Sequence, residues 1–243
     1  MRTLTFAKRN FQEIIRDPLN LSFLFGFPIV LLLLLSAIQA NIPVSMFEVS
    51  HLSPGIAVFG LSFMTLFSAT LIAKDRQSSF MHRLYTTPMT PVDFILGYTL
   101  PLIPIALIEG VAPYIFAVIL GLDVTVNILL SLILLIPVAL LYIAIGLLCG
   151  SVFNDKQVGG ICGALLTNLS AWLSGIWFDL DLVGGAFKKI AYALPFVHSV
   201  EAQRAVISGN YADIFPHLWW VLGYAIVILA IAVLLFLRQM NKQ

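Results

Sequence analysis

The side chain that stands out chemically in this sequence is Glu109, a carboxylic acid in the middle of an apolar run. It lies between Pro104 and Pro113, in a stretch that holds no other charge. An ionised carboxylate at the centre of a bilayer costs roughly 3 kcal/mol on insertion scales, so it needs a partner, a water-filled cavity or a proton. Glu109 is therefore a candidate contact for a substrate that crosses the membrane. The alternative is a protonated or hydrogen-bonded residue that packs helices together.

Two polar residues in another apolar run, Asn168 and Ser174, are weaker candidates for the same path. Gly159 and Gly163 in that run have the small-x-x-x-small spacing of closely packed membrane helices. We therefore expect packing to be the main role of this run.

The motifs of an enzyme are missing from the sequence. It contains no H-E-x-x-H or G-x-S-x-G motif, and its four histidines fall in separate loops or at the ends of apolar runs. It also lacks the G-x-x-x-x-G-K-[ST] loop that cradles nucleotide phosphates. Cys149 and Cys162 lie inside apolar runs as small hydrophobic residues. We expect no catalytic site, metal or bound cofactor in this chain.

The elements that position these residues should be transmembrane helices. Apolar residues make up 60% of the chain, charged residues 10%, and the mean hydropathy is +1.00, all far from soluble averages. A net charge of +1 gives no field that would attract nucleic acid. Crossing a bilayer takes about 20 apolar residues. We expect one all-α membrane domain over 1–243 with six spans, at 19–39, 54–73, 94–120, 127–150, 157–178 and 217–237.

Two helix starts are marked by an N-cap residue followed by proline, Ser53-Pro54 for the second span and Thr90-Pro91 for the third. Basic residues predict the orientation of the spans. With both termini inside, ten Lys and Arg residues lie on the cytoplasmic side and three outside, all three in one long segment. We expect a multi-pass protein of the cell inner (plasma) membrane with cytoplasmic termini. Trp177, Trp219 and Trp220 would then form an outer aromatic belt.

Two cytoplasmic segments are amphipathic. Residues 1–18 should form an interfacial helix that ends at Asp17-Pro18 and serves either to anchor the first span or to dock a partner. Its apolar face would hold Leu4, Ala7, Phe11, Ile14 and Ile15. The loop 74–93 should contain a short amphipathic helix outside the membrane, and a plain linker is the alternative. The loop holds Arg76, Phe80, Met81, His82, Arg83, Leu84 and Tyr85.

The outer segment 179–216 is too long for a simple connection. One amphipathic helix is expected from Val183 to Leu194, and a second should follow Pro195. Glu201 and Arg204 are spaced for an ion pair on the second helix. From the pattern alone these helices would form a surface cap, which contains Phe187, Ile190, Leu194 and Pro195.

The chain resembles the type-two ABC transporter permeases, which include exporters of drugs, antibiotics and polysaccharides. The resemblance rests on Arg16-Asp17-Pro18, on Lys74-Asp75-Arg76 followed by Leu84 and Thr87-Pro88, and on Leu194-Pro195. The chain departs from the family at Gln77-Ser78-Ser79, where members of the family often have a glycine.

The resemblance implies that 74–88 is a coupling helix seated in a groove of a separate soluble ABC ATPase, which would bind ATP and Mg. The N-terminal helix would help to hold that subunit. Segment 179–216 would be a re-entrant hairpin that gates the outer side, with Phe187, Ile190, Leu194 and Pro195 as its candidate gate residues. Six spans would form half of a path through the bilayer, so a second permease chain is expected, and symmetry favours a homodimer. The exported substrate is not specified by the sequence.

Other classes of membrane protein predict different features. A secondary transporter driven by an ion gradient would normally show internal repeats and several intramembrane charges, and neither is found in the sequence. A regulatory subunit that moves no substrate is a further alternative, and transport that survives deletion of the chain would identify it.

Overall fold

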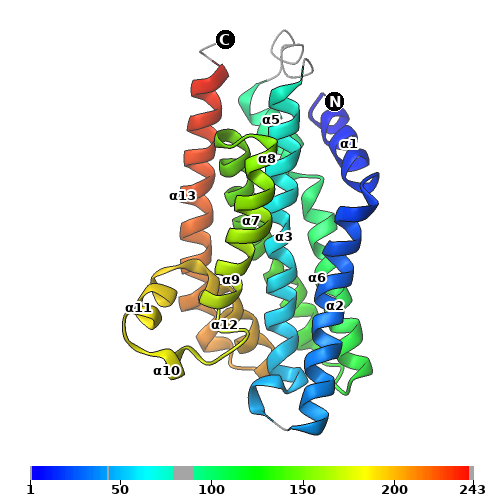
Figure 1. The fold of residues 1–243 in the computed structure, drawn as a ribbon, viewed down its shortest axis with the longest axis vertical. Helices are drawn as coiled ribbons and strands as arrows, with labels where there is room; N and C mark the ends of the chain where they lie inside the picture. The colour runs from blue at the N-terminus through cyan, green and yellow to red at the C-terminus, as the bar shows by residue number, and fades with distance from the viewer. Residues whose placement is uncertain (1, 43, 79–89, 241–243) are drawn as a thin grey trace.

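The computed structural model describes residues 2–42, 44–78 and 90–240, and within these ranges every regular element is helical. The chain folds as an elongated bundle (Figure 1). Five of its helical segments are long and apolar enough to cross a membrane by length and composition. They contain α2 (Pro18–Asn41), α3 (Val49–Gln77), α5 (Pro91–Thr99) with α6 (Leu102–Ile119), α7 (Val126–Val152) and α13 (Ile214–Met240).

Helix α3 forms the centre of the bundle, between α2, α6, α7 and α12 (Pro195–Ser208). In its most apolar window 89% of the residues are buried, compared with 22% for α2 and 17% for α13. The core around α3 contains the fully buried side chains of Ile56, Leu61 and Met64. Helices α2 and α13 therefore lie at the periphery, where their apolar surfaces remain exposed.

Helices α3 and α7 pack closely at two glycines of α7. A Cβ atom on Gly146 would lie 2.5 Å from the carbonyl oxygen of Thr65, and one on Gly150 would lie 2.7 Å from that of Ala69. The Thr65 hydroxyl donates to the Tyr142 carbonyl across the same contact, at 3.0 Å. The small-x-x-x-small contact of this protein is thus Gly146 and Gly150.

The glycines that the sequence suggested for close packing do not have this role. A Cβ on Gly159 would meet nothing within 4 Å, and one on Gly163 would meet only the flexible side chain of Leu66. Both glycines occur in a π-helical segment, Gly159–Leu166. The segment joins α8 (Asp155–Val158) to α9 (Thr167–Leu173), so the run expected at 157–178 is a helix of three parts that ends at Leu173.

Two expected helix boundaries differ from the structure. Helix α3 begins at Val49, so Ser53 does not cap it and Pro54 lies inside its second turn. Helix α3 also continues to Gln77, which places Lys74, Asp75 and Arg76 on its last turn rather than in a loop.

The helix start at Thr90 is confirmed. The Thr90 side chain accepts from the Asp93 backbone N–H, and the Asp93 side chain accepts from the Thr90 N–H, which is a capping box. The third span is interrupted after this start, because α5 ends at Thr99 and α6 begins at Leu102.

The N-terminal helix is present as α1 (Arg2–Ile15), but its apolar face was assigned partly wrongly. Leu4 and Ile15 are exposed, whereas Phe6 and Asn10 are buried. The reason is that α1 packs against α5 with the face that holds Phe6 and Asn10.

The segment before α13 forms α10 (Leu180–Val183), α11 (Gly185–Ala193) and α12. The single helix expected from Val183 to Leu194 is wrong at its start. Gly184 and Gly185 have φ values of +60° and +56°, which separate α10 from α11. The second helix does begin at Pro195, as expected.

The two ends of the molecule hold different elements. Helix α1, the start of α5 and the end of α13 lie at one end, which we call the α1 end (Figure 1). Helices α10 to α12 and the turn between α2 and α3 lie toward the opposite end, which we call the α12 end. Each end brings together segments that are distant in the sequence.

Candidate functional site

A buried carboxylate connects three helices at the α1 end, through an ion pair and a hydrogen bond. The Arg9 guanidinium of α1 lies 2.7 Å from the Asp75 carboxylate of α3, whose side chain is 3% exposed. The hydroxyl of Tyr98 on α5 donates to the same carboxylate oxygen at 2.9 Å. A carboxylate taken out of water needs partners of this kind, because an unpaired buried charge costs several kcal/mol. We call these three residues the junction triad.

The neighbouring contacts of α1 hold the triad in place. Asn10 is fully buried, and its amide donates to the Gly97 carbonyl at 2.9 Å. The Phe6 ring packs edge-on against Tyr98, with centroids 5.0 Å apart. Thr3 donates a hydrogen bond to Asp93 at the start of α5. Helix α1 is therefore fixed to α5 along its length, and the triad extends this contact to α3.

The junction triad joins the two helices that precede and follow the predicted coupling helix in the sequence. Helix α3 ends at Gln77 and α5 begins at Pro91. Of the expected contact residues, Arg76 is described: its guanidinium donates to the Gly150 carbonyl of α7 at 2.7 Å. It thus ties α3 to the end of α7. The others, Phe80, Met81, His82, Arg83, Leu84 and Tyr85, lie outside the described residues.

Glu109 lies in the core of the bundle, between α6 and α3. Glu109 is 1% exposed, and neither of its carboxyl oxygens has a hydrogen-bond partner in the described part of the chain. The carboxyl group fills the space that Gly60 leaves, since a Cβ there would lie 1.5 Å from Oε1. Glu109 is therefore enclosed by this chain's own helices.

Substitutions of Glu109 should separate packing from transport. Glu109→Gln keeps the shape of the side chain and brings no charge, so we expect normal abundance and an unchanged melting temperature. Glu109→Lys places a cation in the same enclosed space at a cost of about 3 kcal/mol, so folded protein should be lost. Abundance and transport are measured together. A Glu109→Gln variant that folds normally but transports nothing would assign the carboxylate to the path.

The other two path candidates bond to their own helical segment. Asn168 is exposed on α9, and its amide donates to the Ala164 carbonyl at 2.7 Å. Ser174 is fully buried, and its hydroxyl donates to the Ala171 carbonyl at 2.9 Å. No hydrogen bond between described residues joins either of them to Glu109. The described hydrogen bonds therefore do not connect the three candidates into one site.

A buried polar chain that sequence analysis missed joins α6, α7 and α12. The Ser131 hydroxyl contacts both the Tyr114 hydroxyl and the side-chain amide of Gln203. All three residues are buried. They are 17 and 72 residues apart, so periodicity within one helix could not have found them.

The expected gate residues occupy different environments at the α12 end. Phe187 is half-buried and contacts Phe178, with ring centroids 6.0 Å apart. Ile190 is exposed, at 53%. Leu194 and Pro195 form the corner between α11 and α12, where Leu194 is the N-cap and Pro195 is buried at the first helical position. These residues shape the hairpin.

Arg204 ties α12 to two other elements. The predicted pair with Glu201 is present at 2.9 Å. The guanidinium also donates to the Gly175 carbonyl at 3.1 Å and to the His51 carbonyl at 3.3 Å. Glu201, Arg204 and His51 line a cavity of about 720 Å³ at this end. The Arg204 side chain is only 12% exposed, so it acts as an internal tie.

A histidine pair connects α12 to α13. The Nδ1 atoms of His198 and His217 lie 2.8 Å apart, and Nε2 of His198 lies 2.9 Å from the Tyr192 carbonyl. The Tyr192 carbonyl can only accept, so His198 donates to it through Nε2, and in its neutral form His198 then accepts through Nδ1 from His217. Burial lowers the pKa of His198, which favours this neutral form. Sequence analysis had placed the two histidines in unrelated positions.

Comparison with known proteins identifies the family. A family model described as ABC-2 type transporter matches residues 1–208, which include α1 to α12 and the whole junction triad. No curated protein matches the chain. The matched range covers well over half of the sequence and confirms the resemblance noted there. This multi-pass membrane protein belongs to the ABC-2 type transporter family.

Proposed function

We propose that this chain is the membrane-spanning permease subunit of an ATP-driven exporter. A separate soluble ABC ATPase, which binds ATP and Mg, would drive it from the α1 end. The observation that carries this proposal is the junction triad, within the range that the family model matches. It links α1 to both helices that flank the predicted coupling helix, so a force on that segment would reach α3 at the centre of the bundle.

We propose that the chain crosses the membrane six times. Helix α1 and the end of α13 lie at the same end of the bundle, which supports an even number of crossings (Figure 1). The three-part helix Asp155–Leu173 supplies the sixth crossing beside the five candidate spans. Its start is capped reciprocally by Asn154 and Gln157. At about 1.5 Å per residue its length approaches the thickness of the hydrocarbon core.

The α1 end faces the cytoplasm in this proposal. It holds the basic residues of α1, the end of α3 and the end of α13. The outer aromatic residues Trp219 and Trp220 then lie at the start of α13, near the other interface.

A second permease chain would complete the path. The described surface offers one exposed strip on the sixth-crossing helix, formed by Leu165, Leu169 and Trp172 with Asn168 between them. An apolar strip with one amide suits contact with another copy of the chain and with a passing substrate. A homodimer places two such strips face to face by symmetry.

Charged substitutions in the predicted coupling helix test the proposal. We expect Leu84→Asp and Tyr85→Asp to leave the chain inserted in the membrane while ATP hydrolysis no longer drives transport. The reason is that a carboxylate would be buried where an apolar side chain enters a groove of the ATPase. Hydrolysis, transport and co-purification of the ATPase are measured on the same preparation.

The matched control is Arg83→Ala, which should have a milder effect because a charge at the rim of an interface contributes less to binding. If both Asp variants bind the ATPase and transport at the normal rate, segment 74–88 is a linker and the proposed coupling is wrong.

A further inference from the structure

A hydrogen bond between two histidine rings fastens the corner between α11 and α12 to α13. The Nδ1 atoms of His198 on α12 and His217 on α13 lie 2.8 Å apart. The opposite nitrogen of the His198 ring, Nε2, lies 2.9 Å from the Tyr192 carbonyl of α11. We call the hydrogen bond between the two rings the histidine latch. Through His198 the latch connects all three helices.

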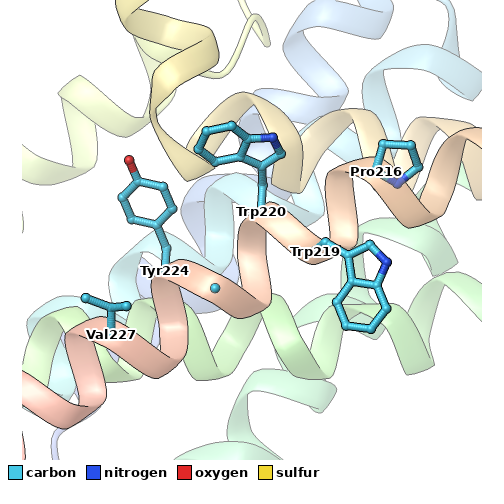
Figure 2. Close-up of a pocket in the computed structure, with 6 residues that line it drawn as sticks. Pro216, Trp219, Trp220, Tyr224 and Val227 are labelled. Atoms are coloured by element: carbon cyan, nitrogen blue, oxygen red, sulfur yellow. The ribbon is translucent and has the colours of Figure 1, made fainter.

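Aromatic contacts hold the His198 ring against α13. Its plane lies at 5° to that of the Trp220 ring, with centroids 5.0 Å apart. Tyr224 stacks on Trp220 at 6.0 Å, and its hydroxyl donates to the Ala193 carbonyl of α11 at 2.6 Å. Figure 2 shows Trp220 and Tyr224 on one side of α13, where they line an apolar groove. The latch and the Tyr224 hydrogen bond thus hold the same corner against α13.

The latch depends on one lone pair, that of Nδ1 in His198. Because Nε2 of His198 carries the proton that is donated to Tyr192, Nδ1 is free to accept from the N–H of His217. A proton added to Nε2 of His217 leaves this bond intact, since His217 still donates through Nδ1. A proton added to Nδ1 of His198 removes the acceptor and turns two N–H groups toward each other. Protonation of His198 therefore breaks the latch.

Histidines are the groups around the latch that ordinarily titrate near neutral pH, because their ordinary pKa puts the change of charge between pH 5 and 8. The carboxylate of Glu201 on α12 is paired with Arg204. The ammonium of Lys188 on α11 is paired with Asp181. The titratable and charged side chains around the two rings are Tyr192 and Lys188 of α11, Glu201 and Arg204 of α12, His51 of α3, and Asp213 and Tyr224 on the α13 side.

Proton binding favours release of the corner. Burial lowers the pKa of His198, and the neighbouring His217 acts in the same direction, whereas the Tyr192 carbonyl and Glu201 oppose them. Once the corner leaves α13, the ring meets water and its pKa returns toward the ordinary value of about 6.5. The released state thus binds the proton more tightly than the latched state. Because one proton is taken up, the ratio of released to latched chains rises by up to about ten-fold for each unit that the pH falls.

We propose that His198 and His217 form a pH-operated latch, which holds the corner between α11 and α12 against α13 at neutral pH and releases it in acid. The latch lies at the α12 end, which faces the outside of the cell in the orientation proposed above. There it would respond to the external pH. The latch itself does not depend on that orientation.

A distance measurement between two spin labels tests the latch. The labels are attached to Ile190→Cys on α11 and Ile231→Cys on α13, two exposed positions, after Cys149→Ala and Cys162→Ala have removed the native thiols. The full chain is placed in phosphatidylcholine nanodiscs, and electron–electron double resonance is recorded at several values between pH 5 and 8. We expect a single distance at the upper limit. A second, longer distance should grow as the pH falls, by up to about ten-fold per unit relative to the first.

Substitutions of three histidines identify the ring that takes up the proton. His198→Gln retains a donor for the Tyr192 carbonyl and an acceptor for His217 but does not titrate, so the shorter distance should persist at every pH. His217→Gln still offers an N–H to His198, so the pH response should remain. The matched control is His51→Gln, which changes another half-buried histidine at the same end and should leave the response unaltered.

Three results would overturn the proposal. An identical distance at both limits of pH in the otherwise unaltered chain would mean that the corner is not released by protons. A pH response that persists in His198→Gln would mean that another group takes up the proton. The variant His217→Phe removes the donor of the latch and should raise the share of the longer distance at every pH. No change in that variant would mean that the hydrogen bond does not hold the corner. The experiment requires no ATPase, so its outcome is independent of the proposed function.

Discussion

Gly146→Ala should prevent most of the protein from reaching its folded state. The added methyl group would lie 1.7 Å from the Ser68 hydroxyl oxygen and 2.5 Å from the Thr65 carbonyl oxygen. The hydroxyl can rotate away, but the carbonyl belongs to the backbone of α3, so the two helices must separate. That separation would also break the hydrogen bond from Thr65 to the Tyr142 carbonyl. We expect a loss of about 3 kcal/mol or more in the free energy of unfolding.

The measurement is the yield of monodisperse protein in detergent, together with its melting temperature. Gly159→Ala is the matched control, since the same methyl group there meets nothing within 4 Å. It should unfold within a degree or two of the unaltered protein. Equal melting temperatures for the two variants would show that α3 and α7 do not depend on this close approach.

Arg9→Met should destabilise the α1 end by about 3 kcal/mol. The variant removes the cation from a carboxylate whose side chain is 3% exposed, and leaves it with the Tyr98 hydroxyl. Removing one partner of a buried ion pair costs more free energy than the intact pair contributes, because the remaining charge stays out of water. The pair of Arg9 with Glu13 is at the surface and should matter little.

Three further variants make this test specific. Lys8→Met removes a neighbouring exposed charge and should leave the melting temperature unchanged. Asp75→Asn keeps a hydrogen-bonding side chain and should be milder than Arg9→Met. The double variant Arg9→Met with Asp75→Leu removes both charges and should recover much of the loss. If Arg9→Met and Lys8→Met behave alike in thermal unfolding, Asp75 does not depend on Arg9.

The helical architecture was largely predictable because a helix that crosses a membrane must be long and apolar enough to span the hydrocarbon core. Five of the expected runs appear as long apolar helical segments, and the helix start at Thr90 was predictable from an N-cap residue followed by Pro91. The interior positions of proline were less predictable. Pro54 was taken as a first helical residue, but a helix can continue through a proline when the packing around α3 compensates for the lost hydrogen bond.

The contacts between helices could not be predicted from one sequence. Arg9 and Asp75 are 66 residues apart, and nothing in their local patterns indicates that one neutralises the other. Two helices do pack closely at small residues spaced four apart, as expected. This spacing occurs twice in the sequence, however, at Gly146 and Gly150 and at Gly159 and Gly163. Which pair lies against a neighbour depends on helix rotation, which the sequence pattern does not fix.

The most direct test of the proposed function is the composition and activity of the assembly isolated from its native membrane. The chain is solubilised in mild detergent, purified by a tag, and analysed by native mass measurement and by Mg-dependent ATP hydrolysis. We predict two copies of this chain with two copies of a soluble ATPase that hydrolyses ATP. A purified, transport-competent chain that carries no ATPase and takes its energy from an ion gradient would contradict the account.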